Sequence, residues 1–141
     1  MAEGSRITRD DKFDIAELIT RYNHAIDDGD PDALADCFIE GGVFEGRAGV
    51  FDGLDRIREL GMTVTPTLKP RHITYNILID AKADEPHAAT VKSHLFFYEV
   101  LPEGLNFRMS GLYTDVVVRT PKGWKFRSRL LKPDWAQPMR T

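Results

Sequence analysis

Asp27 and His72 are the residues of this chain whose types and positions best fit acid–base chemistry. Asp27 follows a stretch of helical periodicity, and His72 opens a later stretch of strand-like composition. A carboxylate beside an imidazole fixes the ring tautomer and increases its basicity, which suits the histidine to general acid–base catalysis near neutral pH. If the fold brings the two together, we expect Asp27 and His72 to form the centre of a catalytic pocket.

Both residues also have a simpler interpretation. Asp27 lies in the run 27–30 (Asp-Asp-Gly-Asp), where turn-forming aspartates are common and where a helix C-terminus disfavours negative charge. His72 fits a half-exposed strand position as well as a catalytic one. Alternation along the strand gives His72, Thr74 and Asn76 a shared, more polar face that favours a pocket. Asn76 is therefore a candidate substrate-binding donor.

Three tyrosines are candidate hydrogen-bond donors to a substrate oxygen, because buried phenols commonly find a polar partner. Tyr22 precedes Asp27 by about one helical turn and can point toward the same region, although core packing is the alternative. Tyr98 and Tyr113 lie in strand-like segments, where aromatic rows more often form the core. By alternation, Tyr98 shares a face with His94 and Phe96, and Tyr113 shares one with Phe107, Met109 and Asp115.

The first half of the chain predicts helices. Apolar residues recur at three- and four-residue spacing from Ile15 to Ile26. Thr8 can cap this helix, and Gly29 marks its end. Asp30-Pro31 is typical of a second helix start, and a short third helix is expected after Gly53.

The second half predicts strands, because it is rich in β-branched and aromatic residues that alternate with turn-forming ones. Helices followed by strands indicate an α+β domain, in which a curved, mainly antiparallel sheet wraps against the N-terminal helices as a cone that encloses a pocket. The expected strands are residues 71–80, 88–101, 105–119 and 122–132, with a short additional strand at Val43–Phe44.

Length and charge limit the classes of function. A chain of 141 residues with 19 basic and 22 acidic side chains most simply forms one domain. We expect no nucleic-acid partner, since no basic stripe is present, and no membrane partner, since no apolar run approaches the ~20 residues of a membrane span. The N-terminal stretch lacks the apolar core of a secretion signal, so a cytoplasmic protein is expected.

No motif for a metal or cofactor is evident, and we expect neither. The single cysteine, Cys37, excludes an internal disulfide and falls on the apolar face of a helix. No compact ligand spacing or glycine-rich phosphate loop occurs. The C-terminal basic residues form either a solvated patch or a site that attracts an acidic substrate group: Arg127, Arg129, Lys132 and Arg140.

Four segments carry a resemblance to a known family. They are residues 15–38 (IAELITRYNHAIDDGDPDALADCF), 51–53 (FDG), 71–76 (RHITYN) and 123–126 (GWKF). This pattern resembles the SnoaL-like branch of the nuclear transport factor 2-like superfamily over residues 8–132, leaving 133–141 as a C-terminal tail. The superfamily hosts dehydratases, isomerases, lyases, cyclases, epoxide hydrolases and non-catalytic subunits.

The scytalone dehydratase group offers the catalytic pattern that fits best. In that group an aspartate after the first helix partners a histidine that opens a strand, and the resemblance places these roles on Asp27 and His72. The group has a second catalytic histidine, where this chain offers Glu99 or Val100, while His94 is out of register. The Asp–His dyad is therefore the part of the pattern that this chain retains.

The expected function is a cofactor-independent dehydratase or related lyase that acts on a small, mostly apolar, ring-containing substrate. Asp27, His72 and Tyr22 would be catalytic, and Asn76, Tyr98 and Tyr113 would bind substrate. An isomerase using the same proton transfer is the first alternative. The second is a non-catalytic ligand-binding or assembly subunit, in which Leu95–Tyr98 and Val116–Val118 form a dimer face. The resemblance implies a homodimer or higher homo-oligomer.

Overall fold

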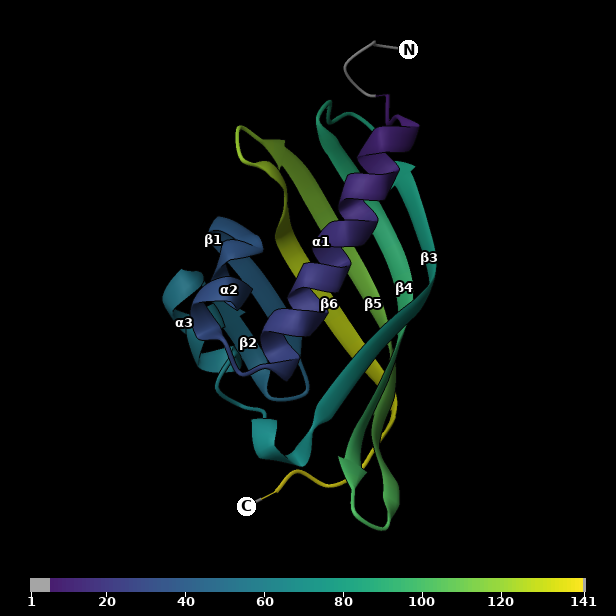
Figure 1. Ribbon diagram of the computed structural model, residues 1–141. Coiled ribbons are helices and arrows are strands. Elements are labelled where there is room, and N and C mark those ends of the chain that lie inside the picture. The colour runs from purple at the N-terminus through teal and green to yellow at the C-terminus, as the bar shows by residue number, and fades with distance from the viewer. Residues whose placement is uncertain (1–5, 141) are drawn as a thin grey trace.

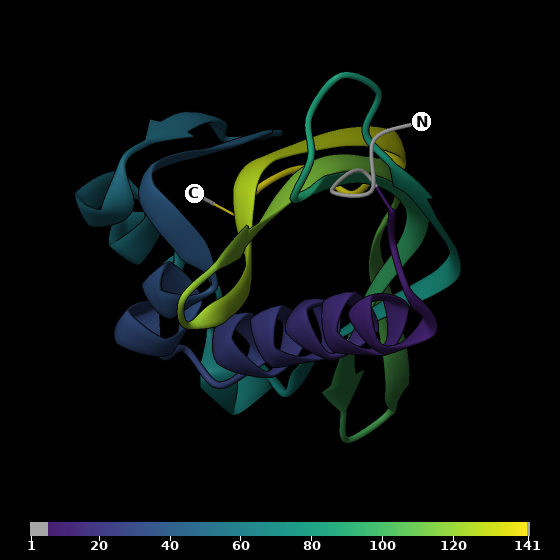
Figure 2. The same cartoon turned by 90° about the horizontal axis from the view of Figure 1, so that it is seen from above.

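The computed structural model describes residues 6–140, which form three α-helices and a short 3₁₀ helix packed against one six-stranded sheet (Figure 1). The sheet is curved but not closed, and α1 lies across its concave side (Figure 2). This arrangement confirms the predicted α+β class. The elements in chain order are α1 (Arg9–Asp27), α2 (Pro31–Asp36), β1 (Phe38–Gly46), β2 (Gly49–Asp52), α3 (Leu54–Leu60), η2 (Pro66–Leu68), β3 (Pro70–Ala81), β4 (Ala88–Leu101), β5 (Gly104–Thr120) and β6 (Gly123–Ala136).

The sheet is mixed, with strand order β2-β1-β6-β5-β4-β3. β3 to β6 form an antiparallel meander, in agreement with the mainly antiparallel sheet that was predicted, whereas β1 runs parallel to β6 and pairs with β2 as a hairpin. The short strand expected at Val43–Phe44 is therefore a nine-residue strand with a hairpin partner. β6 continues past Lys132 to Ala136, so residues 133–136 belong to the sheet rather than to a tail.

Local capping fixes where α1 begins and ends. Thr8 and Asp11 form a reciprocal capping box at its start. At its end the amide of Gly29 donates to the carbonyl of Ile26, and that of Asp30 donates to the carbonyl of Ala25, which is the Schellman pattern. Gly29 has φ +63°, and a Cβ there would lie 2.7 Å from a proline side chain, so only glycine fits this turn. The turn holds Asp27 in the last helical position.

Several β-bulges interrupt the alternation that the sequence predicts, and those in β3 and β5 bear on the candidate site. In β3, Asn76 and Ile77 oppose one residue of β4, and Asn76 has φ +52°. Ile79 is consequently buried at 8% exposure, whereas Ile73, which strict alternation would place on the same face, is 43% exposed. In β5, Met109 pairs with Phe97 and Phe107 with Tyr98, so Arg108 between them has no partner.

The core lies between the concave face of the sheet and α1. The helix contributes the predicted stripe from Ile15 to Ile26, and α2 and α3 add Leu34, Ile57 and Leu60. Across the described residues, no helix combines the length and apolar character that crossing a bilayer requires.

Candidate active site

Asp27 and His72 meet at one end of the cone, where the last turn of α1 contacts the start of β3. The Oδ1 atom of Asp27 lies 2.5 Å from Nδ1 of His72. The backbone amide of His72 also donates to the same carboxylate, at 3.2 and 3.1 Å from its two oxygens. These contacts satisfy the negative charge that the helix C-terminus alone would disfavour.

The His72 ring is fixed on both sides. Its side chain is 7% exposed and that of Asp27 is 12% exposed. The ring stacks on Phe97 with the centroids 4.1 Å apart and the planes 13° from parallel. Because Nδ1 faces the carboxylate, the proton of the neutral ring lies on Nδ1 and Nε2 is left as an acceptor. This is the tautomer that a general base needs.

The Tyr22 hydroxyl is a second polar group in the same region. Tyr22 is 0% exposed, and its hydroxyl has no hydrogen-bond partner among the described residues. Burial, together with the nearby phenol of Tyr113, raises the pKa of Tyr22 well above its ordinary value. Burial also raises the pKa of Tyr113. Both phenols therefore stay protonated and available as donors at neutral pH.

A pocket of about 250 Å³ opens beside these residues, and His72, Tyr22 and Tyr113 line it. The volume suits a small ring-sized ligand, slightly below the ~300 Å³ at which drug-sized sites begin. Most of the remaining wall is apolar, from α1, the β1 strand, α3 and the concave face of the sheet: Ile26, Phe44, Leu60, Leu95, Phe97, Met109 and Leu131.

Four charged residues complete the wall, and we call them the rim cluster: Arg47, Glu99, Arg108 and Arg140. Arg140 donates to both oxygens of Glu99, at 2.7 and 2.6 Å, and Asn106 donates a third bond at 3.1 Å. The bonds from Arg140 hold the pKa of Glu99 below its ordinary value despite burial. Glu99 is therefore an ionised acceptor and does not resemble the second histidine of the dehydratases.

The residues after β6 form one side of the pocket mouth. The Gln137 amide donates to the Arg108 carbonyl at 2.9 Å, and the Gln137 side chain donates to Asn106 at 2.8 Å. Met139 and Arg140 then reach the pocket wall. The segment expected to be a tail thus contributes to the candidate site.

A second buried acid–base pair, Asp115 and Arg129, lies deeper in the core. Arg129 donates to both carboxylate oxygens, at 2.9 and 3.1 Å, and both side chains are 0% exposed. The guanidinium carbon lies 4.4 Å from the ring centre of Tyr22 and 3.7 Å from that of Tyr113. Burial lowers the pKa of Arg129, but the charge of Asp115 more than offsets this, so the pKa is raised and the group stays charged.

Two residues that the sequence analysis predicted to bind substrate, Asn76 and Tyr98, lie away from the pocket. Asn76 lies in the β3 bulge, where its amide contacts Nδ1 of His94 at 3.2 Å outside the pocket. Tyr98 packs on Phe96 on the outer face of the sheet and does not line the pocket. Neither side chain lines this pocket, because alternation carried no information about the bulge or about which face is concave.

The predicted C-terminal basic patch is also corrected. Arg129 is buried with Asp115, Arg127 pairs with Glu85, and Arg140 pairs with Glu99. Lys132 remains exposed. Each arginine of this group is thus matched by its own carboxylate, and the four do not form one surface.

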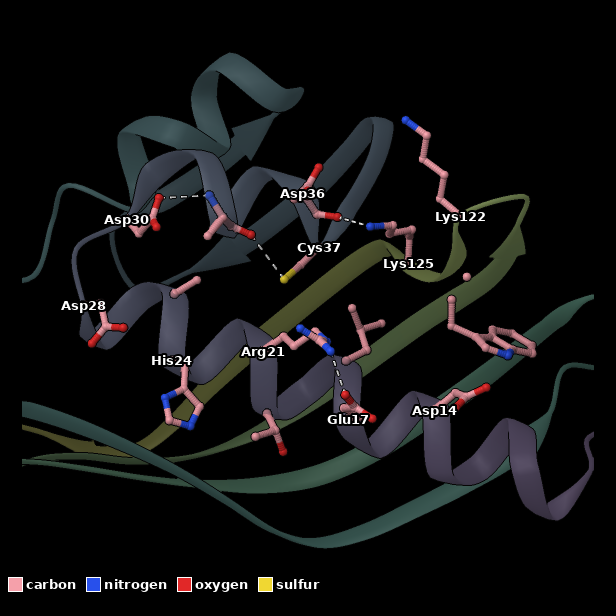
Figure 3. A pocket seen from close by; sticks show the side chains of 16 residues that line it. Asp14, Glu17, Arg21, His24, Asp28, Asp30, Asp36, Cys37, Lys122 and Lys125 are labelled. Atoms are coloured by element: carbon pink, nitrogen blue, oxygen red, sulfur yellow. Dashed lines mark hydrogen bonds and ion pairs between the residues drawn. The ribbon is translucent and has the colours of Figure 1, made fainter.

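A wider groove of about 690 Å³ lies on the other side of α1, between α1, α2 and the β5–β6 turn (Figure 3). Its wall carries charges of both signs, among which Arg21 pairs with Glu17 at 2.7 Å. Cys37 is buried beside it, and burial raises the pKa of its thiol to about 11. Neither Asp27 nor His72 borders this groove, so the groove is separate from the candidate active site.

Within residues 6–140, no three histidine, cysteine or carboxylate side chains lie close enough together to hold a metal ion.

Comparison with known proteins agrees with this architecture. Residues 8–130 match the SnoaL-like domain family, and the chain belongs to that family. The family includes polyketide cyclases and ring-modifying enzymes. No curated protein matches the sequence significantly.

Solved structures show the same fold. Rv3472 of Mycobacterium tuberculosis, described as a protein of unknown function, is 28% identical, with 87% of this chain and 71% of that chain covered and a TM-score of 0.78. A Nostoc punctiforme protein of unknown function with a cystatin-like fold is 26% identical over 96% and 99% of the two chains, with a TM-score of 0.81. A nuclear transport factor 2-like protein from Novosphingobium aromaticivorans is 23% identical over 86% and 80%, with a TM-score of 0.77.

Proposed function

We propose that the pocket is the active site of a dehydratase or related lyase that acts on a small, mostly apolar, ring-containing substrate. The observation that carries this proposal is the 2.5 Å contact between Asp27 and Nδ1 of His72 at the wall of a largely apolar pocket. The unpartnered Tyr22 hydroxyl in the same wall supports it. Membership of a family with ring-modifying enzymes agrees with the substrate class.

The proposed reaction moves one proton through His72. Nε2 removes a proton from a carbon next to a substrate carbonyl, and the electrons pass to the carbonyl oxygen to form an enolate. Tyr22 donates a hydrogen bond to this oxyanion, while Asp27 stabilises the imidazolium. The enolate then expels a β-hydroxyl group, which takes the proton from Nε2 and leaves as water. An isomerase would instead return the same proton to a different carbon.

The test incubates the protein with a panel of cyclic β-hydroxy ketones in D₂O. NMR and mass spectrometry then measure deuterium incorporation and loss of water from each ketone. We expect His72→Gln to lower the rate about 10²- to 10⁴-fold, the usual range for a positioned acid–base group. His94→Gln is the matched control, because His94 contacts Asn76 outside the pocket. Equal rates in His72→Gln and wild type would rule out the mechanism. Exchange without water loss would favour the isomerase.

The outer face of the sheet favours a second role, in assembly. Ile73, Phe96 and Ser110 pair side by side across β3, β4 and β5, and Trp135 of β6 continues the row at 53% exposure. Phe107 is 51% exposed and packs on Phe96. We infer that this face joins two copies of the chain as a homodimer. Leu95 and Phe97, which the sequence assigned to a dimer face, point inward.

Sedimentation measures this role directly. We expect a particle of twice the 16.0 kDa protomer mass, which Phe107→Glu converts to monomer. Met62→Glu, at a residue 63% exposed outside the sheet, is the control and should leave the mass unchanged. A wild-type protein that sediments as a monomer at micromolar concentration would contradict the dimer.

A further inference from the structure

Arg108 enters the pocket because of the β5 bulge. Its strand neighbours Phe107 and Met109 are paired with adjacent residues of β4, so Arg108 is the extra residue. Bulges of this kind re-aim side chains and are common beside active sites. Phe107 is consequently exposed on the outer face, whereas Arg108 and Met109 both line the pocket. The bulge therefore places a guanidinium on the concave face, next to the row that holds His72 and Phe97.

Arg108 has no ion-pair partner among residues 6–140. Its Nη1 donates to the Gln137 side-chain oxygen at 2.7 Å, and its Nη2 donates to the Pro138 carbonyl at 3.4 Å. Both acceptors are neutral. No carboxylate in the described part of the chain forms an ion pair with Arg108 or with Arg47. Arg140, in contrast, is neutralised by Glu99.

The pocket wall therefore has an excess of positive charge. The rim cluster contains three guanidinium groups and one carboxylate, which leaves two positive charges unmatched. Burial lowers the pKa of Arg108, and repulsion from Arg140 and Arg47 lowers it further, while attraction to Glu99 offsets part of this. A group in this environment gains from an anion, because charge attraction is stronger in a partly desolvated pocket than in water.

The chemistry of the wall selects one kind of anion. A guanidinium presents paired N–H donors whose spacing matches the two oxygens of a carboxylate. Glu99 lies in the same wall and repels the second charge of a phosphate ester. The remaining lining is apolar and the volume is about 250 Å³, which favours a compact ring.

We propose that the substrate carries a carboxylate, which Arg108 binds while the reacting carbon lies beside His72. Arg108 is then the specificity-determining residue of the pocket. The proposal rests on the proposed function for the position of the reacting carbon, but the binding of the acid group does not depend on turnover.

The experiment compares benzoate with benzamide, which have nearly the same shape and differ in charge. Calorimetric or NMR titration of the wild-type protein should give a Kd for benzoate about 10- to 100-fold below that for benzamide, as one charge-assisted hydrogen-bonded contact provides. Arg108→Gln should raise the benzoate Kd to the benzamide value and leave benzamide unchanged. Glu99→Gln should tighten benzoate binding, because it removes the negative charge of the wall.

Arg21→Gln is the matched control: it removes the same charge from an exposed site on α1 and should change neither Kd. The proposal is wrong if wild-type protein binds neither probe, binds both equally, or loses both equally in Arg108→Gln. A parallel titration of His72→Gln separates the two proposals. If the His72→Gln variant is inactive but still binds benzoate selectively, both the catalytic role of His72 and carboxylate binding by Arg108 are supported. If turnover depends on His72 but benzoate is not preferred over benzamide, only the proposal of carboxylate binding is wrong.

Discussion

The fold contains two buried acid–base pairs that look alike in composition and differ in what surrounds them. Asp27–His72 lies at the pocket wall, with 12% and 7% of the side chains exposed. Asp115–Arg129 is fully sealed, and aromatic rings of Tyr22, Tyr113 and Phe126 cover its guanidinium. Access to the pocket and the identity of the base distinguish the pair that we propose to be catalytic from the sealed one.

Breaking the sealed pair should have the largest effect. Arg129→Met leaves the Asp115 carboxylate buried without a partner, so we expect the free energy of unfolding to fall by about 3–5 kcal/mol. The double variant Asp115→Leu/Arg129→Met should recover most of this loss, because it removes both charges. Urea denaturation measures both values. A double variant as unstable as the single one would show that the pair stabilises the fold beyond charge balance.

Removing the charge of Asp27 from the Asp27–His72 pair should lower turnover rather than stability. Asp27→Asn keeps an acceptor for the His72 amide but removes the charge that stabilises the imidazolium. We expect the rate to fall about 10²- to 10³-fold, within the range for positioned acid–base catalysis, while the free energy of unfolding changes by less than about 1 kcal/mol. Asp28→Asn, one residue further and exposed, is the control for both measurements. A large stability loss in Asp27→Asn would make this pair structural as well.

Tyr22 lines the pocket and also packs against the guanidinium of Arg129. Removing its hydroxyl separates an effect on turnover from an effect on stability. Because this hydroxyl has no partner among residues 6–140, Tyr22→Phe should leave the free energy of unfolding unchanged or raise it by up to about 1 kcal/mol. Turnover should fall about 10²-fold if the hydroxyl stabilises an oxyanion. Thermal unfolding and rate measurements on the same preparation test the two effects. Full activity in Tyr22→Phe would remove Tyr22 from the mechanism.

The ion pair Glu99–Arg140 is more exposed than the two pairs compared above, with side chains 3% and 50% exposed. We expect its loss to have the smallest effect on stability. The hydrogen bonds from Arg140 lower the folded-state pKa of Glu99 below its ordinary value of 4.5. The pair therefore stabilises the fold at pH values above about 4.5, and this contribution is lost as pH falls through the folded-state pKa.

Denaturation from about pH 7 to pH 3 measures the effect as the difference between wild type and Glu99→Gln. The difference should be constant in the upper part of the range and shrink in the acid part. Arg140→Gln should abolish the same acid-dependent component. If the stability difference between wild type and Glu99→Gln grew as the pH fell, the pKa of Glu99 would be raised in the folded state rather than lowered.

The ends of elements were predictable because they depend on neighbouring residues alone. Thr8 and Gly29 set the limits of α1, and the start of β3 follows the change in composition after Pro70. The sequence therefore placed Asp27 and His72 at element ends. Their pairing was inferred from the family resemblance, and the structure shows them in contact. Their catalytic role remains a prediction.

The interior of the sheet was less predictable, because it depends on strand register. Asp115 and Arg129 oppose each other only through the β5–β6 pairing, which no local pattern specifies. Several charged residues lie in β6, and nothing local marks Arg129 as the one that points inward, where a charge needs a partner. The bulges at Asn76 and Arg108 reversed the faces of Ile79 and Phe107 for the same reason.

The β5 bulge has a genetic consequence. The pairs Phe97–Met109 and Tyr98–Phe107 flank Arg108 on either side, so deleting that single residue would leave an uninterrupted ladder. The pocket would lose its unmatched arginine, and the flanking strand pairs, the Asp27–His72 contact and the outer aromatic row would stay in place. Loss or gain of one codon is thus a short evolutionary route between a pocket that accepts acids and one that accepts neutral molecules.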